Sequence, residues 1–245
     1  MTAAAQLVGP VGGHTVADVR AAEEVLMAQL PPGALMQRAA TGLAHAVLDV
    51  LDSSYGARVG LLVGSGNNGA DGLYAGARLA RRGVRMEAVL VDPAKVHAGG
   101  LAAYRAAGGR LVQRLGPCDL ALDAMLGIGG TPGLRDDAWR HVEGLSCPVL
   151  AVDVPSGIDV DGATVPASGR TVRAAATVTF GTAKLGLLVG PAADCAGALR
   201  LVDIGLGPYL PAPAVRLVTA ADLRRLAATH AAREDLSSLA GGGRA

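Results

Sequence analysis

The sequence predicts an α/β domain in which helices cover both faces of a mostly parallel β-sheet. Between residues 57 and 154, short apolar runs alternate with segments of helical periodicity. This alternation is typical of parallel strands joined by crossover helices. The apolar runs have the length and composition of buried parallel strands. A Gly-rich turn at residues 64–72 follows the first run, where open α/β sheets bind ligands.

Two helices are predicted ahead of the sheet. Residues 15–29 carry apolar residues at helical spacing after Thr15, a favourable N-cap residue. Residues 32–51 start at a proline pair, which suits the first turn of a helix. The predicted strands are 57–63, 84–91, 118–124, 148–154, 177–180 and 198–204, and the predicted intervening helices are 72–82, 94–107 and 134–144.

The predicted domain spans residues 14–210. We expect residues 1–13 to form a flexible N-terminal tail, because they are interrupted by glycine and proline. Residues 211–245 are expected to hold a helix at 219–232 and a flexible end rich in glycine.

Composition excludes several classes of protein. Of 245 residues, 51% are hydrophobic and 18% are charged, which favours a folded core over disorder. The net charge of +1 and the aromatic content of 2% argue against a nucleic-acid partner. No run of about 18 apolar residues lacks a charge or a glycine, so no membrane partner is expected. Cys118, Cys147 and Cys195 are far apart and form no CxxC pair, which favours a reducing, cytoplasmic setting.

The first segment with chemical potential is GSGNNGADG at residues 64–72. Gly64, Gly66 and Gly69 fit the G-x-G-x-x-G pattern of dinucleotide-binding folds, and Asp92 lies near the end of the next predicted strand. This pattern makes a nicotinamide-dependent dehydrogenase one hypothesis. It does not explain the additional Asn and Asp side chains in the turn. These side chains either close the turn on themselves or face a ligand whose phosphate lies at the helix start.

Two further segments place acids at the ends of apolar strands. Asp123 precedes the Gly-rich residues 125–133, and Asp153 precedes a Pro-Ser-Gly turn that contains Ser156. Each acid could simply cap a turn. Because the carboxyl ends of parallel strands share one edge of the sheet, their oxygens could also hold a hard cation of low charge. The five histidines are scattered, and each is expected to be a surface residue or to fill a helix position rather than to act as a ligand. Ser156 lacks the elbow motif of a hydrolase.

In series, GSGNNGADG, LDAMLGIG and VDVPSGID resemble the NAD(P)H-hydrate epimerase family, whose fold is the YjeF N-terminal domain. The resemblance continues through residues 35–44, 177–191 and 198–206, and covers about residues 14–210. It implies a three-layer α/β/α Rossmann-like sandwich. It also implies an isomerase that interconverts the R and S forms of hydrated NADH and NADPH, a step in nicotinamide nucleotide repair.

The resemblance further implies the residues of the site. Asp153 would act at the reacting ring, and Lys184 would approach the same pocket as a second catalytic residue. Asn68, Asp123 and Ser156 would ligate a potassium ion. The implied substrate-binding residues are Asn67, Asn68, Gly69, Ala70, Asp71, Gly127, Ile128, Gly129, Gly130, Thr131, Pro132, Gly133 and Asp153.

One position departs from the family pattern, which has a glycine where this chain has Ala70. We expect the methyl group to crowd the bound phosphate, or to shift the backbone if the φ angle there is positive.

The resemblance also implies partners and a mechanism. The functional partner would be an ADP- or ATP-dependent NAD(P)H-hydrate dehydratase, and a homodimer is possible. In the mechanism, the ring nitrogen expels hydroxide from carbon 6, water returns on the other face, and a carboxylate moves the proton. Ring opening is a second route. A non-catalytic nucleotide- or protein-binding module of the same fold stays open as an alternative, although retention of Asn68, Asp71, Asp123 and Asp153 favours the enzyme.

Overall fold

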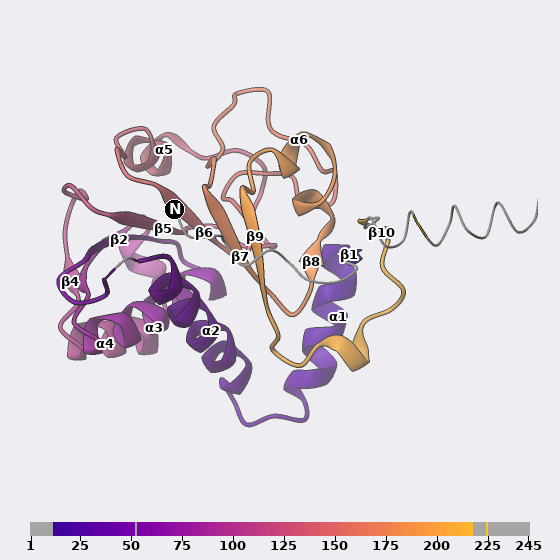
Figure 1. Ribbon diagram of the computed structural model, residues 1–245, viewed down its shortest axis with the longest axis horizontal. Helices are drawn as coiled ribbons and strands as arrows, with labels where there is room; N and C mark the ends of the chain where they lie inside the picture. The colour runs from indigo at the N-terminus through magenta and orange to yellow at the C-terminus, as the bar shows by residue number, and fades with distance from the viewer. Residues whose placement is uncertain (1–11, 52, 218–223, 225–245) are drawn as a thin grey trace, which may run out of the picture.

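A seven-stranded sheet forms the middle layer of the molecule (Figure 1). The computed structural model describes residues 12–51, 53–217 and 224. Every neighbouring pair of strands in this sheet is parallel, which confirms the predicted α/β class. The strands, in spatial order, are β4 (Arg110–Leu111), β3 (Arg85–Leu90), β2 (Arg58–Val63), β5 (Leu120–Ala124), β6 (Val149–Val152), β7 (Ala176–Phe180) and β9 (Ala198–Val202).

Helices cover both faces of this sheet, so the three-layer α/β/α sandwich is confirmed (Figure 1). One face carries α2 (Ala34–Val50), α3 (Asn67–Arg81) and α4 (Ala98–Ala106), and the other carries α5 (Asp136–Val142) and α6 (Gly190–Ala193). The central strands are buried from both sides: Leu61, Leu122 and Leu150 are almost fully inaccessible. This double burial explains why the strands have continuous apolar sequences rather than alternating ones.

The first helix, α1 (Val16–Met27), starts where the sequence predicts. The Thr15 side chain accepts a hydrogen bond from the backbone of Asp18, and the Asp18 carboxylate accepts one from the backbone of Thr15. This reciprocal capping box satisfies two backbone donors that a helix start leaves free. Val19, Ala22 and Leu26 form the buried face of α1.

A small second sheet joins segments that are remote in the sequence. Its strands are β10 (Val215–Arg216), β1 (Gly12–His14) and β8 (Ala183–Lys184). The predicted tail therefore extends too far, because Gly12 and Gly13 belong to a strand. Such short strands carry no periodicity of their own, and their partners lie about 170 to 200 positions away. Residues 1–11 and, apart from residue 224, the predicted helix at 219–232 lie outside the described residues.

The sheet has a topological switch point between β2 and β5. From β2 the chain builds β3 and β4 on one side, and it then returns to place β5 on the other side. A crevice is expected at the carboxyl ends of β2 and β5. The remaining short helices are η1 (Pro93–Lys95), η2 (Leu185–Leu187) and η3 (Gly207–Tyr209). Within the part of the chain that the structure describes, no helix has the length and apolar content needed to cross a membrane.

Candidate active site

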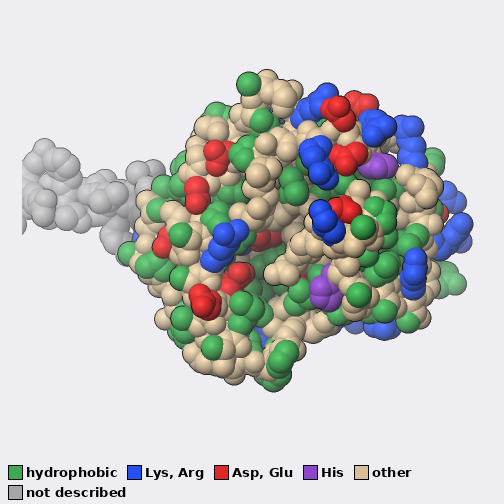
Figure 2. All heavy atoms as spheres, turned by 180° about the vertical axis from the view of Figure 1, so that it is seen from behind, with side chains coloured by type: hydrophobic (Ala, Val, Ile, Leu, Met, Phe, Trp, Pro, Cys, Tyr) green, Lys and Arg blue, Asp and Glu red, His purple; other side chains and the backbone are tan. Residues whose placement is uncertain are grey.

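A cleft of about 890 Å³ lies at the switch point, beyond the carboxyl ends of β2, β5 and β6. Its lining includes residues of α1, residues between 30 and 39, the start of α3, residues 125–130, and Asp153 and Phe180. Figure 2 shows a face of the molecule that is hollowed near its middle, with acidic side chains in and beside the hollow. A second cavity, of about 670 Å³, lies near the opposite ends of the strands and contains none of the predicted site residues. The larger cleft, at the carboxyl ends of the strands, is therefore the candidate active site.

Two glycines allow the turn after β2 to pass close to the end of β5. A Cβ atom on Gly64 would lie 1.8 Å from the carbonyl oxygen of Met125, and a Cβ atom on Gly69 would lie 2.2 Å from the carbonyl oxygen of Gly64. Helix α3 begins at Asn67, earlier than the predicted residue 72, because the polar segment is itself the first helical turn.

Ala70 lies in this first helical turn. It is fully buried, and its N–H donates to the carbonyl of Gly66 at 3.2 Å, as in a regular helix. The φ angle of Ala70 is negative, and its side chain does not line the cleft. The backbone shift considered for a methyl group at this position is therefore not needed.

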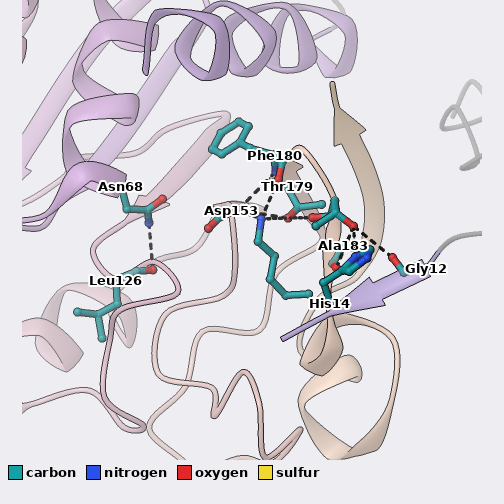
Figure 3. A network of polar contacts seen from close by, with 10 residues as sticks. Gly12, His14, Asn68, Leu126, Asp153, Thr179, Phe180 and Ala183 are labelled. Carbon is teal, nitrogen blue, oxygen red and sulfur yellow. Dashed lines mark hydrogen bonds and ion pairs between the residues drawn. The ribbon is translucent and has the colours of Figure 1, made fainter. Parts of the chain in front are cut away.

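Asp153 and Lys184 form a buried ion pair at the edge of the cleft. The ammonium Nζ of Lys184 lies 2.5 Å from Oδ1 of Asp153, and it also donates to Thr179 Oγ1 at 3.0 Å and to the carbonyl of Phe180 at 2.9 Å. All three ammonium hydrogens thus have acceptors. Figure 3 shows this network, which reaches β1 through His14. The structure brings the two predicted catalytic residues into direct contact.

The backbone of Asp153 is unusual. Its φ angle is 67°, one of two positive values among the described non-glycine residues. Its N–H donates to the carbonyl of Val178 at 2.7 Å, and this bond to β7 holds the conformation in place. Aspartate tolerates the left-handed region better than most residues. A held, sparsely populated conformation of this kind is more frequent at functional sites than elsewhere.

Asp71 is a second carboxyl group in the same cleft, and it has a different environment. It lies on α3 with 9% of its surface exposed, and its Oδ1 has no hydrogen-bond partner. Burial, together with the nearby carboxyl groups of Asp153 and Glu23, raises the pKa of Asp71 well above its usual value. Burial also raises the pKa of Glu23, which faces the cleft from α1. The cleft therefore favours a protonated carboxyl group at Asp71, beside the ion-paired Asp153.

Asp123, Ser156 and Asn68 meet around the backbone of Leu126. Asp123 is fully buried and accepts hydrogen bonds from the Ser156 backbone at 2.8 Å and the Ser156 hydroxyl at 2.6 Å. Burial raises the pKa of Asp123 to about 6, although the Ser156 bonds oppose the rise. Asn68 donates through Nδ2 to the carbonyl of Leu126 at 3.0 Å, which leaves its buried Oδ1 without a partner.

This donor set fits a potassium ion. It offers an amide oxygen, a carboxylate and a hydroxyl, which are the hard ligands that cations of this kind prefer. The unpartnered Oδ1 of Asn68 and the buried charge of Asp123 are both features that a bound cation would compensate.

The predicted substrate-binding residues divide into two groups. Asn67, Asn68, Asp71, Asp153 and Gly127–Gly130 line the cleft. The others do not, because Gly69 and Ala70 face the protein interior and residues 131–133 turn towards Gly157, whose carbonyl accepts from Gly133. Asp123, Ser156 and Lys184 lie behind the cleft wall rather than in it.

Sequence reasoning missed several residues of the site. Arg20 and Glu23 reach the cleft from α1, where a charged helix face is usually only a solvated one. His97 lines the cleft beside Tyr74, with ring centroids 5.8 Å apart. His14, expected at the surface or within a helix, is instead buried in β1, and its Nδ1 lies 2.8 Å from Thr182 Oγ1.

The family model and the similar proteins that match this chain all point to one family. The family model described as YjeF-related protein N-terminus matches residues 32–186. A bifunctional NAD(P)H-hydrate repair enzyme of Mycobacterium tuberculosis is 46% identical over 201 residues, covering 79% of this chain and 41% of the relative. An NAD(P)H-hydrate epimerase of Microbacterium testaceum is 42% identical over 213 residues, covering 82% of this chain and 81% of the relative.

A solved structure supports the fold. The crystal structure of the yeast protein ynu0, YNL200c, matches with a TM-score of 0.60 and 19% identity, over 72% of this chain and 83% of the yeast chain. The present chain spans about two fifths of the length of its mycobacterial relatives. Because the family model covers more than half of the chain and relatives exceed 40% identity, this chain belongs to the family of YjeF-related protein N-terminal domains.

Proposed function

We propose that this chain is an NAD(P)H-hydrate epimerase, an isomerase that interconverts the R and S hydrates of NADH and NADPH. The names of its relatives support this proposal. The observation that carries it is the pairing of two unlike carboxyl groups in one cleft. The raised pKa of Asp71 favours its protonated form, whereas Asp153 forms an ion pair with Lys184. Unlike carboxyl environments are a common basis for acid–base chemistry at neutral pH.

The chemistry requires proton transfer but no oxidant. The lone pair of the ring nitrogen expels the hydroxyl group from carbon 6, and the protonated Asp71 carboxyl supplies the proton that converts it to water. The ionised Asp153 stabilises the cationic ring. Water then adds to the opposite face, and the proton that it loses returns to Asp71 through solvent water, which regenerates the starting state. Opening of the ring to an aldehyde would use the same two carboxyl groups.

Lys184 has a supporting part in this mechanism. Its ammonium group donates a hydrogen bond to Oδ1 of Asp153 and is held in place by hydrogen bonds to Thr179 and the carbonyl of Phe180. The other oxygen, Oδ2, takes part in none of them and is therefore the one that would face the ring. Asn67, Asn68 and residues 127–130 would hold the nucleotide, since they line the same cleft.

A potassium ion would be held by Asn68, Asp123 and Ser156. When bound, it would neutralise the buried Asp123 and fix the loop that starts at Leu126. The ion is thus proposed as a structural support for the substrate loop.

The proposed setting is cytoplasmic, with a dehydratase that consumes one of the two hydrates as functional partner. Such a partner requires a single epimer, which gives epimerisation its purpose. A homodimer stays a prediction.

The direct test is to incubate the pure chain with the R hydrate of NADH and to follow the appearance of the S hydrate by reversed-phase chromatography. Equilibration well above the spontaneous rate is expected. Incubation with NAD and a panel of alcohols tests the dehydrogenase alternative and should give no reduced cofactor, since Asp92 pairs with Lys95 instead of lining the cleft. Unaccelerated epimerisation would overturn the proposal and favour a binding module.

A further inference from the structure

Two cysteines that are 29 positions apart in the sequence lie in contact at the edge of the sheet away from the cleft. The Sγ atoms of Cys118 and Cys147 are 2.6 Å apart. Cys118 lies just before β5 and Cys147 just before β6, and these strands are neighbours in register, with Ala121 opposite Val149. The parallel pairing of β5 and β6 therefore carries the two thiols to the same place.

Both thiols can be reached from solvent. Cys118 and Cys147 are each partly exposed, and Cys118 also lines the second cavity, of about 670 Å³. The third cysteine, Cys195, is only 1% exposed and lies in a separate apolar cluster. The chain thus has one accessible pair and one buried single thiol.

We propose that Cys118 and Cys147 form a reversible disulfide by exchange with a low-molecular-weight disulfide. The thiolate of one cysteine attacks the small disulfide, forms a mixed disulfide and releases one small thiolate. The second cysteine, as its thiolate, then attacks the protein sulfur of the mixed disulfide and releases the other small thiolate. The two protein thiols are oxidised by two electrons, and the small disulfide is reduced to two thiols that take up the protons.

The surroundings of the pair favour slow exchange rather than a catalytic thiol. Burial and the neighbouring Cys147 thiol raise the pKa of Cys118 to about 12. Reactive catalytic cysteines show the opposite shift. A pair of this kind stays reduced while small thiols are in excess, and it closes when the surrounding pool becomes oxidising.

Closure would connect the starts of β5, which carries Asp123, and β6, which Asp153 follows directly. The closed loop would contain the whole segment 125–133. A cross-link around a loop of about 30 residues restricts the unfolded chain, and for a domain of this size we expect the melting temperature to rise by roughly 5–15 °C. The active cleft lies at the far end of both strands, about 16 Å away at 3.3 Å per residue, so epimerisation should change by less than about twofold.

The test treats the full chain with glutathione disulfide and measures intact mass, free thiols and melting temperature. The expected result is a loss of two mass units, one remaining free thiol, a cross-linked peptide pair containing residues 118 and 147, and a higher melting temperature. Dithiothreitol should reverse all four changes. The Cys195→Ser variant is the matched control and should behave in the same way, but with no free thiol left.

The Cys118→Ser variant distinguishes a disulfide between the two cysteines from a general reaction of exposed thiols with glutathione disulfide. It should acquire one glutathione adduct on Cys147, with no cross-link and no rise in melting temperature. If this variant folds poorly, Cys147→Ser gives the complementary test with the adduct on Cys118. Three free thiols in the oxidised wild-type chain, or a cross-link that involves Cys195 or a second molecule, would overturn the proposal.

Discussion

The Lys184 ammonium and the Asp153 carboxylate form an ion pair of 2.5 Å in which the lysine side chain is only 1% exposed. One partner comes from the end of β6 and the other from β8, in the second sheet. Removing either charge from a buried pair leaves the other uncompensated, which costs more than the pair itself contributes. The same contact therefore influences both the stability of the fold and the chemistry of the cleft.

We expect Asp153→Asn to lower the epimerisation rate at least about a hundredfold, because a neutral amide cannot stabilise the cationic ring as the carboxylate does. Asparagine suits the positive φ angle of this position. The variant should nevertheless lose about 3–5 kcal/mol of unfolding free energy, since Lys184 stays buried and charged without its partner. Melting curves and rates are measured on the same preparation.

The double variant Asp153→Asn/Lys184→Met separates stability from catalysis. Removing the stranded ammonium should restore much of the lost unfolding free energy and leave the rate low. A double variant that turns over within tenfold of wild type per folded molecule would show that the ion pair has only a structural role.

Asp71→Asn tests the protonated carboxyl group. Because the folded state raises the pKa of Asp71, it binds more protons than the unfolded state above about pH 4, and wild-type stability falls as the pH rises. Asparagine does not titrate, so the variant should gain stability relative to wild type as the pH rises above about 4. Urea unfolding across this range measures the difference. The rate should fall about 10²–10⁴-fold.

The exposed Glu24→Gln change on α1 is the control for this prediction. It should show little change in relative stability across the same pH range. A constant stability difference between Asp71→Asn and wild type at every pH would mean that Asp71 is ionised in the folded protein.

Potassium should stabilise the wild-type chain more than lithium at equal ionic strength. At a concentration a hundred times the dissociation constant, one site contributes about 2.7 kcal/mol. Asn68→Ala removes the unpartnered amide oxygen without touching the Asp123–Ser156 bonds, and it should abolish the difference between the two salts. Asn67→Ala is the matched control and should retain the difference. Equal potassium dependence of the melting temperature in wild type and Asn68→Ala would exclude the proposed site.

In Gly69→Ala, the new Cβ atom would lie 2.2 Å from the backbone carbonyl oxygen of Gly64. The backbone of the turn must move to relieve this contact, so we expect the variant to lose more than about 2 kcal/mol of unfolding free energy. Gly66→Ala is a strict comparison in the same turn: a Cβ atom there meets nothing within 4 Å, and its φ angle is −94°. It should stay within about 1 kcal/mol of wild type. Thermal unfolding of both variants checks the prediction, and equal losses would contradict it.

Local sequence determined most of the main sheet and its helices. Strands such as β2 and β5 are predictable because they are short apolar runs, and α1 is predictable because Thr15 caps an amphipathic segment. The order of these elements implies a parallel sheet, and a parallel sheet brings the ends of its strands to one edge. For this reason the sequence alone predicts that Asp123 and Asp153 lie near each other.

The tertiary structure decided the features that depend on remote contacts. The pairing of β1 with β8 and β10, the burial of His14, the contact of Lys184 with Asp153, and the meeting of Cys118 with Cys147 all join residues that are far apart in the chain. No local pattern records such a pairing, because each partner alone is compatible with an exposed position. The different environments of Asp71 and Asp153 arise in the same way, since burial and neighbouring charge exist only once the layers have packed.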